Sequence, residues 1–168
     1  MGNQLAWNKR YSIGVDTIDK EHKKLFSILN KLFDYGQEED KSKWVCQESV
    51  KYFKDHALQH FADEEAYMAS IDYEGLEMHR RIHKNFRDIT LPALERELDS
   101  SDYSEIAVNH FLGVCAGWLI GHTTIEDRAI VSGKPIKQWE NLLSEEEQGV
   151  MGRSIVSQVY SMFELDSR

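Results

Sequence analysis

The sequence predicts an all-α protein: an antiparallel up-down four-helix bundle with an extended N-terminal arm and an extra C-terminal helical segment. Three observations predict this class. Apolar residues recur at spacings of three and four through most of the 168-residue chain, which is the periodicity of helices. The chain contains only two prolines, Pro92 and Pro135, so long helices are permitted. Short polar stretches separate four segments that are each long enough to span a bundle.

Two helices are expected in the first part of the chain. The first runs from about Ile18 to Tyr35 and stops at Gly36, because glycine commonly terminates helices. After a polar connection over residues 37–42, the second runs from about Lys43 to Ala69. Residues before Ile18 are expected to be extended and to pack across the bundle through Trp7, Tyr11 and Ile13. The inward-facing apolar positions of the two helices are Leu25, Ile28, Leu29, Leu32, Val50, Phe53, Ala57, Phe61 and Met68.

Two more helices follow. The third begins near Tyr73, and Pro92 either kinks it or marks a break, since proline lacks a backbone donor and restricts the residue before it. Residues 99–102 form a polar loop that offers caps to the next helix. The fourth helix runs from about Ser104 to Val131 and ends before the Gly-Lys-Pro stop at residues 133–135.

The chain divides into two predicted parts. Residues 1–135 are expected to form the helical domain, and residues 136–168 a C-terminal extension that is partly helical. An amphipathic stretch between Ile155 and Phe163 cannot bury its apolar stripe alone. Three roles therefore stay open for the extension: packing on the bundle, self-association, or leading into an output module.

The composition argues against several kinds of partner. A formal net charge of −9 repels phosphate backbones, so no nucleic-acid partner is expected. No window resembles a membrane span, and the first residues do not resemble a signal peptide. We therefore expect a cytoplasmic protein in which Cys46 and Cys115 are buried free thiols.

The most informative feature is the placement of histidines and carboxylates on the helices. His79 and His83 are four residues apart, as are His60 and Glu64, and residues at this spacing lie on one face of a helix. Each pair alone is a weak signal. All four predicted helices contribute from their apolar faces, however, and burying such groups without partners costs several kcal/mol. The candidate ligands are His22, His60, Glu64, His79, His83, His122 and Asp127.

A metal centre is the simplest way to satisfy this set. Seven ligands are too many for one tetrahedral zinc, and the absence of cysteine from the set disfavours iron–sulfur and soft-metal sites. Imidazole suits iron, and carboxylates can bridge two ions. If two six-coordinate ions share both carboxylates and one oxo or hydroxo bridge, five histidines leave a single position open for a small diatomic ligand.

One spacing does not fit an ideal helix. Asp127 follows His122 by five residues, so the two side chains point in directions about 140° apart on an α-helix. They can converge if Asp127 reaches sideways between two ions, or if the helix widens locally.

Four motifs resemble those of the hemerythrins, in particular the bacterial ones (bacteriohemerythrins). The resemblance covers about Trp7 to Lys134. The motifs are GVDTIDKEH at residues 14–22, HFADEE at 60–65, HRRIH at 79–83, and WLIGH at 118–122 followed by Asp127. All seven ligand types occur in the order and spacing of the family, so the match is specific.

The resemblance implies a di-iron centre that binds molecular oxygen or another small diatomic ligand reversibly. It implies that His79, His83 and His122 bind one iron and that His22 and His60 bind the other, where oxygen binds. Glu64 and Asp127 would bridge. Trp118 and Leu119 match residues that line the oxygen pocket in the family.

The sequence departs from the family at Thr123, which stands where isoleucine is common. Our hypothesis is that Thr123 makes the pocket more polar and speeds oxidation of the irons. Two other histidines, His56 and His110, are expected to lie outside the centre, because HFxxEE selects His60 and because His110 lies three turns before His122.

Two classes of function are consistent with this centre. The first is oxygen binding for carriage, storage or sensing, without enzymatic turnover. The alternative is a di-iron enzyme that acts on peroxide, nitric oxide or ferrous iron. The sequence supplies no dedicated acid or base beside the open position, and the Glu-x-x-His pairs of ferritin-like oxidases are absent. Both features favour binding.

Overall fold

The computed structural model describes residues 5, 7–36 and 43–132. The predicted connection over residues 37–42 and the predicted C-terminal extension lie outside the described residues. The described part forms four helical rods. The first two are the single helices α1 (Asp16–Gly36) and α2 (Lys43–Ser70). The third rod consists of α3 (Leu76–Asn85), the π-helix η2 (Phe86–Thr90) and α4 (Leu91–Ser100) in succession, and the fourth of α5 (Glu105–Gly121), the π-helix η3 (His122–Asp127) and α6 (Arg128–Ser132). The all-α prediction is confirmed.

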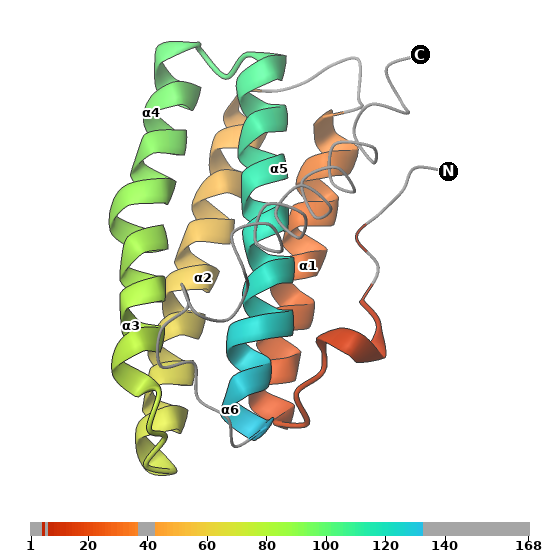
Figure 1. The fold of residues 1–168 in the computed structure, drawn as a ribbon. Helices are drawn as coiled ribbons and strands as arrows, with labels where there is room; N and C mark the ends of the chain where they lie inside the picture. Colours follow the sequence, from red (N-terminus) through yellow and green to blue (C-terminus); the bar gives the residue numbers. More distant parts are fainter. Residues whose placement is uncertain (1–4, 6, 37–42, 133–168) are drawn as a thin grey trace, which may run out of the picture.

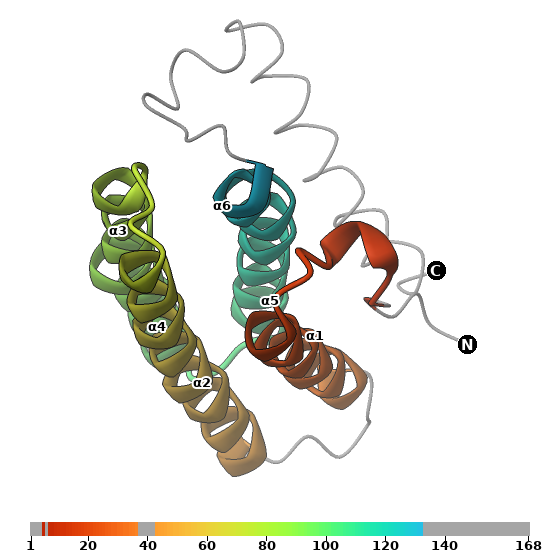
Figure 2. The same cartoon turned by 90° about the horizontal axis from the view of Figure 1, so that it is seen from below.

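The rods form an antiparallel bundle (Figure 1). Helix α1 packs against α2 and α5, α2 packs against α3, and α4 packs against α5, so the four rods form a ring (Figure 2). The start of α1, the end of α2, α3 and α6 all lie at the lower end of the bundle in Figure 1. This end contains every candidate metal ligand. None of the described helices is long and apolar enough to cross a membrane.

The core consists of large apolar side chains from all four rods. The predicted inward positions of α1 and α2, from Leu25 to Met68, are buried. Phe53 of α2 contacts Phe111 of α5 edge to face, with ring centroids 6.0 Å apart. Fully burying one such side chain contributes roughly 1.5–3 kcal/mol. The buried residues of this cluster include Leu25, Phe26, Leu29, Leu32, Phe53, Phe61, Phe86, Leu91, Leu98, Phe111 and Leu112.

The turn between α2 and α3 makes the third rod begin later than predicted, at Leu76 instead of near Tyr73. Asp72 adopts a left-handed conformation with φ 51°, which ends α2. The ring of Tyr73 then folds over Gly75, where a Cβ atom would lie 2.7 Å from the ring. A larger residue at this position would require the Tyr73 ring to move, and α3 starts only beyond it.

Pro92 does not break the third rod. It lies at the start of α4, directly after the π-helix η2. A proline ring in an α-helix collides with the carbonyl four residues earlier. The wider turn of η2 relieves this conflict, and the rod continues from Leu76 to Ser100.

The N-terminal arm is held against the bundle by Asp19. Its carboxylate accepts hydrogen bonds from Ser12 Oγ at 2.6 Å, from the backbone of Ile13 at 2.9 Å and from the backbone of Gly14 at 3.2 Å. The predicted packing is confirmed, because Tyr11 and Ile13 are buried. The prediction of a wholly extended arm is wrong in one detail: Lys9–Tyr11 form a 3-10 turn, η1, whose N-cap is an asparagine.

Candidate metal centre

The seven predicted ligands converge at one end of the bundle. His22 comes from α1, His60 and Glu64 from α2, His79 and His83 from α3, and His122 and Asp127 from η3. Each of these side chains is buried, with an exposed fraction of 3% or less. Four rods therefore direct polar groups into one volume that water does not reach.

The donor atoms fall into two groups, each compact enough to surround one ion. Glu64, His79, His83 and His122 form the first, and His22, His60, Glu64 and Asp127 form the second. Within each group, every donor lies within 4.8 Å of the others. We call them the three-histidine group and the two-histidine group.

Each carboxylate directs one oxygen to each group. Glu64 Oε1 lies 2.7 Å from His79 Nε2 and 3.2 Å from His83 Nε2, while Oε2 lies 3.4 Å from His60 Nε2. Asp127 behaves in the same way. Its Oδ1 lies 2.9 Å from His122 Nε2, and its Oδ2 lies 3.0 Å from His22 Nε2. Both side chains are therefore placed as bridges between two positions.

The ring nitrogens fit a cation better than they fit one another. His83 and His79 each place Nε2 about 3 Å from His122 Nε2, at 3.0 and 3.1 Å, and His22 Nε2 lies 2.9 Å from His60 Nε2. A neutral imidazole can donate from only one of its nitrogens. Converging nitrogens of this kind cannot all be paired. Asp127 also lacks a conventional hydrogen-bond partner on either oxygen within the described part of the chain. Metal ions in the two groups would satisfy all of these atoms.

The π-helix η3 explains how Asp127 reaches the centre. It spans His122–Asp127 and brings residue i+5 beneath residue i. The two side chains contact at 2.9 Å although an ideal α-helix would point them apart. Local widening of the helix was one of the two predicted solutions, and it is the one observed.

Two carboxylates outside the groups fix the orientation of two histidines. His60 Nδ1 donates to Glu21 Oε2 at 2.6 Å, and His83 Nδ1 donates to Glu65 Oε1 at 3.0 Å. Both bonds leave Nε2 facing the centre, as metal-binding histidines require. We did not predict these roles from the sequence. The role of Glu65 could have been suspected from the sequence, because it directly follows the candidate ligand Glu64. Glu21 gave no such indication, because it adjoins His22 in sequence but accepts a hydrogen bond from His60 on another helix.

The carboxylates also govern the charge of the histidines when no metal is bound. Burial opposes protonation of His60, but hydrogen bonds to Glu21 and Glu64 outweigh it and raise its pKa to about 9. The pKa of His122 is likewise raised well above its ordinary value, because Asp127 outweighs the effect of burial. Burial dominates at His83 and lowers its pKa. The pKa of Glu64 is lowered in spite of burial, because histidines surround it.

Aromatic rings enclose the three-histidine group. Trp118 stacks on His122 with centroids 4.4 Å apart, and its ring also stacks on Phe86 at 4.1 Å. Phe61 stacks on His83 at 4.1 Å. These rings shield the centre from water and hold the imidazoles in place.

The remaining predicted pocket residues lie on the same rod as Trp118. Leu119 and Thr123 are buried, and Thr123 Oγ1 has no hydrogen-bond partner among the described residues.

His56 and His110 lie outside the centre, as predicted. His56 Nδ1 contacts the carbonyl of Tyr52, and His110 Nδ1 donates to Glu97. Cys46 and Cys115 are buried and free.

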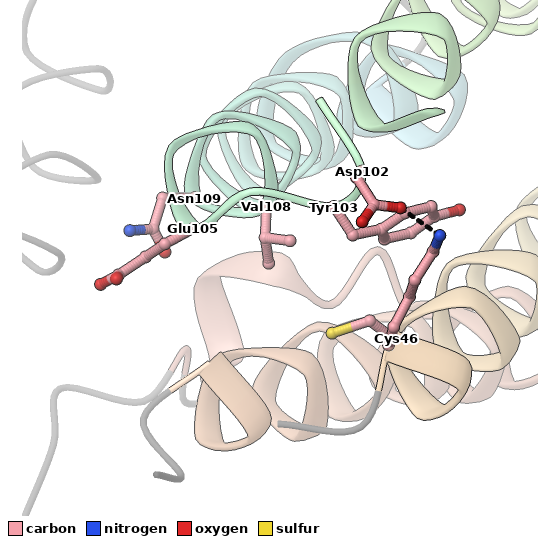
Figure 3. A pocket seen from close by; sticks show the side chains of 7 residues that line it. Cys46, Asp102, Tyr103, Glu105, Val108 and Asn109 are labelled. Atoms are coloured by element: carbon pink, nitrogen blue, oxygen red, sulfur yellow. Dashed lines mark hydrogen bonds and ion pairs between the residues drawn. The ribbon is translucent and has the colours of Figure 1, made fainter. Parts of the chain in front are cut away.

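A separate pocket of about 200 Å³ lies at the opposite end of the bundle (Figure 3). Cys46 and Tyr103 line it, and an ion pair joins Lys43 to Asp102 beside it. Cys46 and His60 are fourteen residues apart on α2, which separates the pocket from the candidate centre by about 20 Å. The pocket is therefore unrelated to the metal ligands.

The fold and the donor set together define a class of protein: helical bundles that hold metal ions among side chains from facing helices. Comparison with known sequences identifies the family within this class. The family model "Hemerythrin HHE cation binding domain" matches residues 13–132, which include all seven candidate ligands. The chain belongs to the hemerythrin family.

Individual relatives agree with this assignment. A bacteriohemerythrin of Clostridium acetobutylicum is 31% identical over 132 residues, covering 76% of this chain and 98% of the relative. A bacteriohemerythrin of Pseudomonas aeruginosa is 25% identical over 151 residues, covering 90% of this chain and 95% of the relative. A myohemerythrin of Theromyzon tessulatum is 29% identical over 111 residues, covering 64% of this chain and 84% of the relative.

Proposed function

We propose that this protein binds molecular oxygen reversibly at a centre of two non-haem iron ions. His79, His83 and His122 hold one ion, His22 and His60 hold the other, and Glu64 and Asp127 bridge them. The observation that supports this most directly is that each carboxylate directs one oxygen to each group of histidines. Membership of the hemerythrin family, to which the bacteriohemerythrin and myohemerythrin relatives also belong, supports oxygen as the ligand.

The difference between the two groups supports binding at a single position. The three-histidine group contributes one more nitrogen than the two-histidine group, and both contain Glu64. Asp127 belongs to the two-histidine group, and its Oδ1 also lies 2.9 Å from His122 Nε2. When bound, the iron pair would supply the redox chemistry on which reversible oxygen binding depends. The protein contributes fixed ligands and exclusion of water, through Phe61, Trp118 and Leu119 in particular.

The test is metal analysis of the purified protein followed by optical spectra of the ferrous form. We expect two irons per chain and a coloured adduct that forms in air and disappears under vacuum. Repeated turnover of peroxide, without a reversible adduct, would replace this proposal with the enzyme alternative. One metal ion per chain, or none, would contradict the two-ion centre.

Thr123 supplies a second test, specific to the ligand pocket. We propose that its buried hydroxyl makes the pocket more polar and accelerates oxidation of the irons. A Thr123→Ile variant is then expected to oxidise more slowly than the wild-type protein in air. An unchanged oxidation rate would show that Thr123 does not influence the ligand site.

The C-terminal extension can be tested by truncation. We propose that residues 1–135 contain the complete iron-binding domain and that residues 136–168 add packing or self-association. Deleting residues 137–168 should then leave the iron content unchanged while lowering the melting temperature or altering the oligomeric state. If neither of the last two properties changes, both roles of the extension are excluded.

A further inference from the structure

Glu126 is a half-buried carboxylate that the centre described above does not use. It lies on η3 directly before Asp127, and its Oε2 has no hydrogen-bond partner among the residues that the structure describes. Within that same part of the chain, the outward ring nitrogen of His122, Nδ1, is also buried and unpaired. The two atoms lie 3.8 Å apart. Two unsatisfied polar atoms therefore face each other behind the candidate centre.

The π-helix places Glu126 on this side of the ring. In an α-helix, residue i+4 would lie beneath His122 and residue i+5 would point away. In η3 the register is wider, so Asp127 at i+5 lies beneath the inward nitrogen, Nε2. Glu126 at i+4 is displaced toward Nδ1. One local distortion thus directs two consecutive carboxylates to the two nitrogens of a single imidazole.

Metal binding changes what His122 needs from its surroundings. When Nε2 binds a metal, the ring proton must be on Nδ1, which then needs an acceptor. His60 and His83 already have such acceptors in Glu21 and Glu65. At 3.8 Å, Glu126 must move by about 1 Å to make an ordinary hydrogen bond. Part of its side chain reaches the surface, with 22% exposed, so it has room to move.

We propose that Glu126 is the positioning residue for His122: it accepts the Nδ1 proton in the metal-loaded protein and thereby retains the metal in the three-histidine group. This inference rests on the proposed assignment of His122 as a ligand. It also predicts that Glu126 acts mainly in the loaded state. In the metal-free protein, Glu126 Oε2 and His122 Nδ1 are 3.8 Å apart and make no hydrogen bond, so Glu126 has no hydrogen bond to lose there.

The experiment compares three variants, Glu126→Ala, Glu126→Gln and the control Glu48→Gln, whose carboxylate is exposed on α2. Each protein is loaded anaerobically with ferrous iron, and its release to a coloured chelator is followed over time. We expect release from Glu126→Ala to be about 10-fold faster than from the wild-type protein, as for other groups that orient metal ligands. Glu126→Gln should be intermediate, because an amide oxygen can still accept the proton. The control should match the wild type.

A second measurement separates positioning from a general structural role. The melting temperatures of the metal-free Glu126 variants should fall by less than those of the iron-loaded variants, because at 3.8 Å from His122 Nδ1 the Glu126 carboxylate makes no hydrogen bond until the metal is bound. Wild-type release rates in Glu126→Ala would overturn the inference while leaving the di-iron centre intact. A lower melting temperature of the metal-free variant, by as much as that of the loaded variant, would also overturn it. If the wild-type protein binds no iron, both proposals are wrong.

Discussion

Glu64 occupies the most connected position at the residue scale. Its oxygens approach His79, His83 and His60 within 2.7–3.4 Å, and the residue is completely buried. A carboxylate in this position neutralises positive charge in both groups at once. The histidines in turn lower its pKa, so it stays ionised at neutral pH.

Replacing Glu64 with glutamine should therefore remove the iron from both groups of histidines and not from only one of them. The amide removes the negative charge of one of the two carboxylates that the ions share, and Asp127 alone then remains as a bridge. The measurement is iron per chain after dialysis against a weak chelator. The matched control is Asp63→Asn, one residue earlier and exposed, which should keep its full iron content. Retention of one ion by Glu64→Gln would show that the two groups bind independently.

Thr123 is a second residue whose surroundings allow a definite prediction. Its Oγ1 is buried with no hydrogen-bond partner in the described part of the chain, whereas Thr124 Oγ1 donates to the carbonyl of Ile120 at 2.7 Å. Valine has the shape of threonine without the hydroxyl. Thr123→Val should thus raise the free energy of unfolding of the metal-free protein by about 1 kcal/mol. Urea denaturation measures this, and Thr124→Val, the control, should show no such gain.

At the scale of the secondary-structure elements, the junction between the N-terminal arm and α1 depends on one side chain. Asp19 accepts three hydrogen bonds from residues 12–14 and is nearly buried. The positive φ of Gly14, 83°, lets the chain turn there toward α1. The arm in turn lies along α1, where Trp7 packs edge to face on Phe26 in the middle of the helix.

Replacing Asp19 with alanine should release the arm. The buried backbone N–H of Ile13 and the partly buried one of Gly14 would lose their acceptor, at a cost of about 2 kcal/mol. Limited proteolysis should then cut the chain before Asp16, and urea denaturation should show the loss of stability. Asp16→Ala removes an exposed carboxylate from the same helical turn and should cost about 0.5 kcal/mol. Equal effects of the two substitutions would contradict the role of Asp19.

The elements also show which features the sequence could predict. Apolar periodicity predicted all four rods and placed the start of α2 at Lys43, because burial of one face dominates such helices. The start of α3 was misplaced, because Tyr73 and Gly75 pack against each other in a way that periodicity does not encode. The widening of η3 could be anticipated only because two expected ligands stood five residues apart.

The candidate ligands could be predicted because they recur at helical spacings on the inward faces of the helices. The carboxylates that contact the outward nitrogens of these histidines could not be predicted in this way. The partner of His60 is Glu21, on a different helix, and the choice depends on how α1 and α2 pack. The contact between Glu126 and His122 depends on the π register. Such contacts belong to tertiary structure, and local sequence patterns do not determine them.

At the scale of the whole molecule, the candidate centre joins all four rods at one end of the bundle. Without metal, that end contains converging imidazoles and two buried carboxylates, and protons must take the place of cations. The stability of the metal-free protein should therefore depend on pH in a way that the loaded protein does not share. A histidine whose pKa is raised in the folded protein stabilises the fold toward low pH, whereas one whose pKa is lowered destabilises the fold toward low pH.

The metal-free protein should lose stability as the pH rises from about 6.5 to about 9. His60 has a folded pKa of about 9 against 6.5 when unfolded, so its contribution is complete below 6.5 and lost through 9. That shift corresponds to about 3 kcal/mol. The pKa values of His22, His79 and His122 are also raised and act in the same direction. His83, whose pKa is lowered, acts in the opposite direction by losing stability below 6.5.

Melting temperatures of metal-free and iron-loaded protein between pH 6 and 9.5 test this expectation. Glu64 and Asp127 do not contribute in this range, because their pKa values are lowered and their effect appears only in acid. In the loaded protein, metal replaces the protons on the ring nitrogens, so the decline toward pH 9 should disappear. His60→Gln should flatten the metal-free profile, whereas His56→Gln, which alters a histidine outside the centre, should not. A metal-free profile as flat as the loaded one would mean that these histidines stay neutral when no metal is bound.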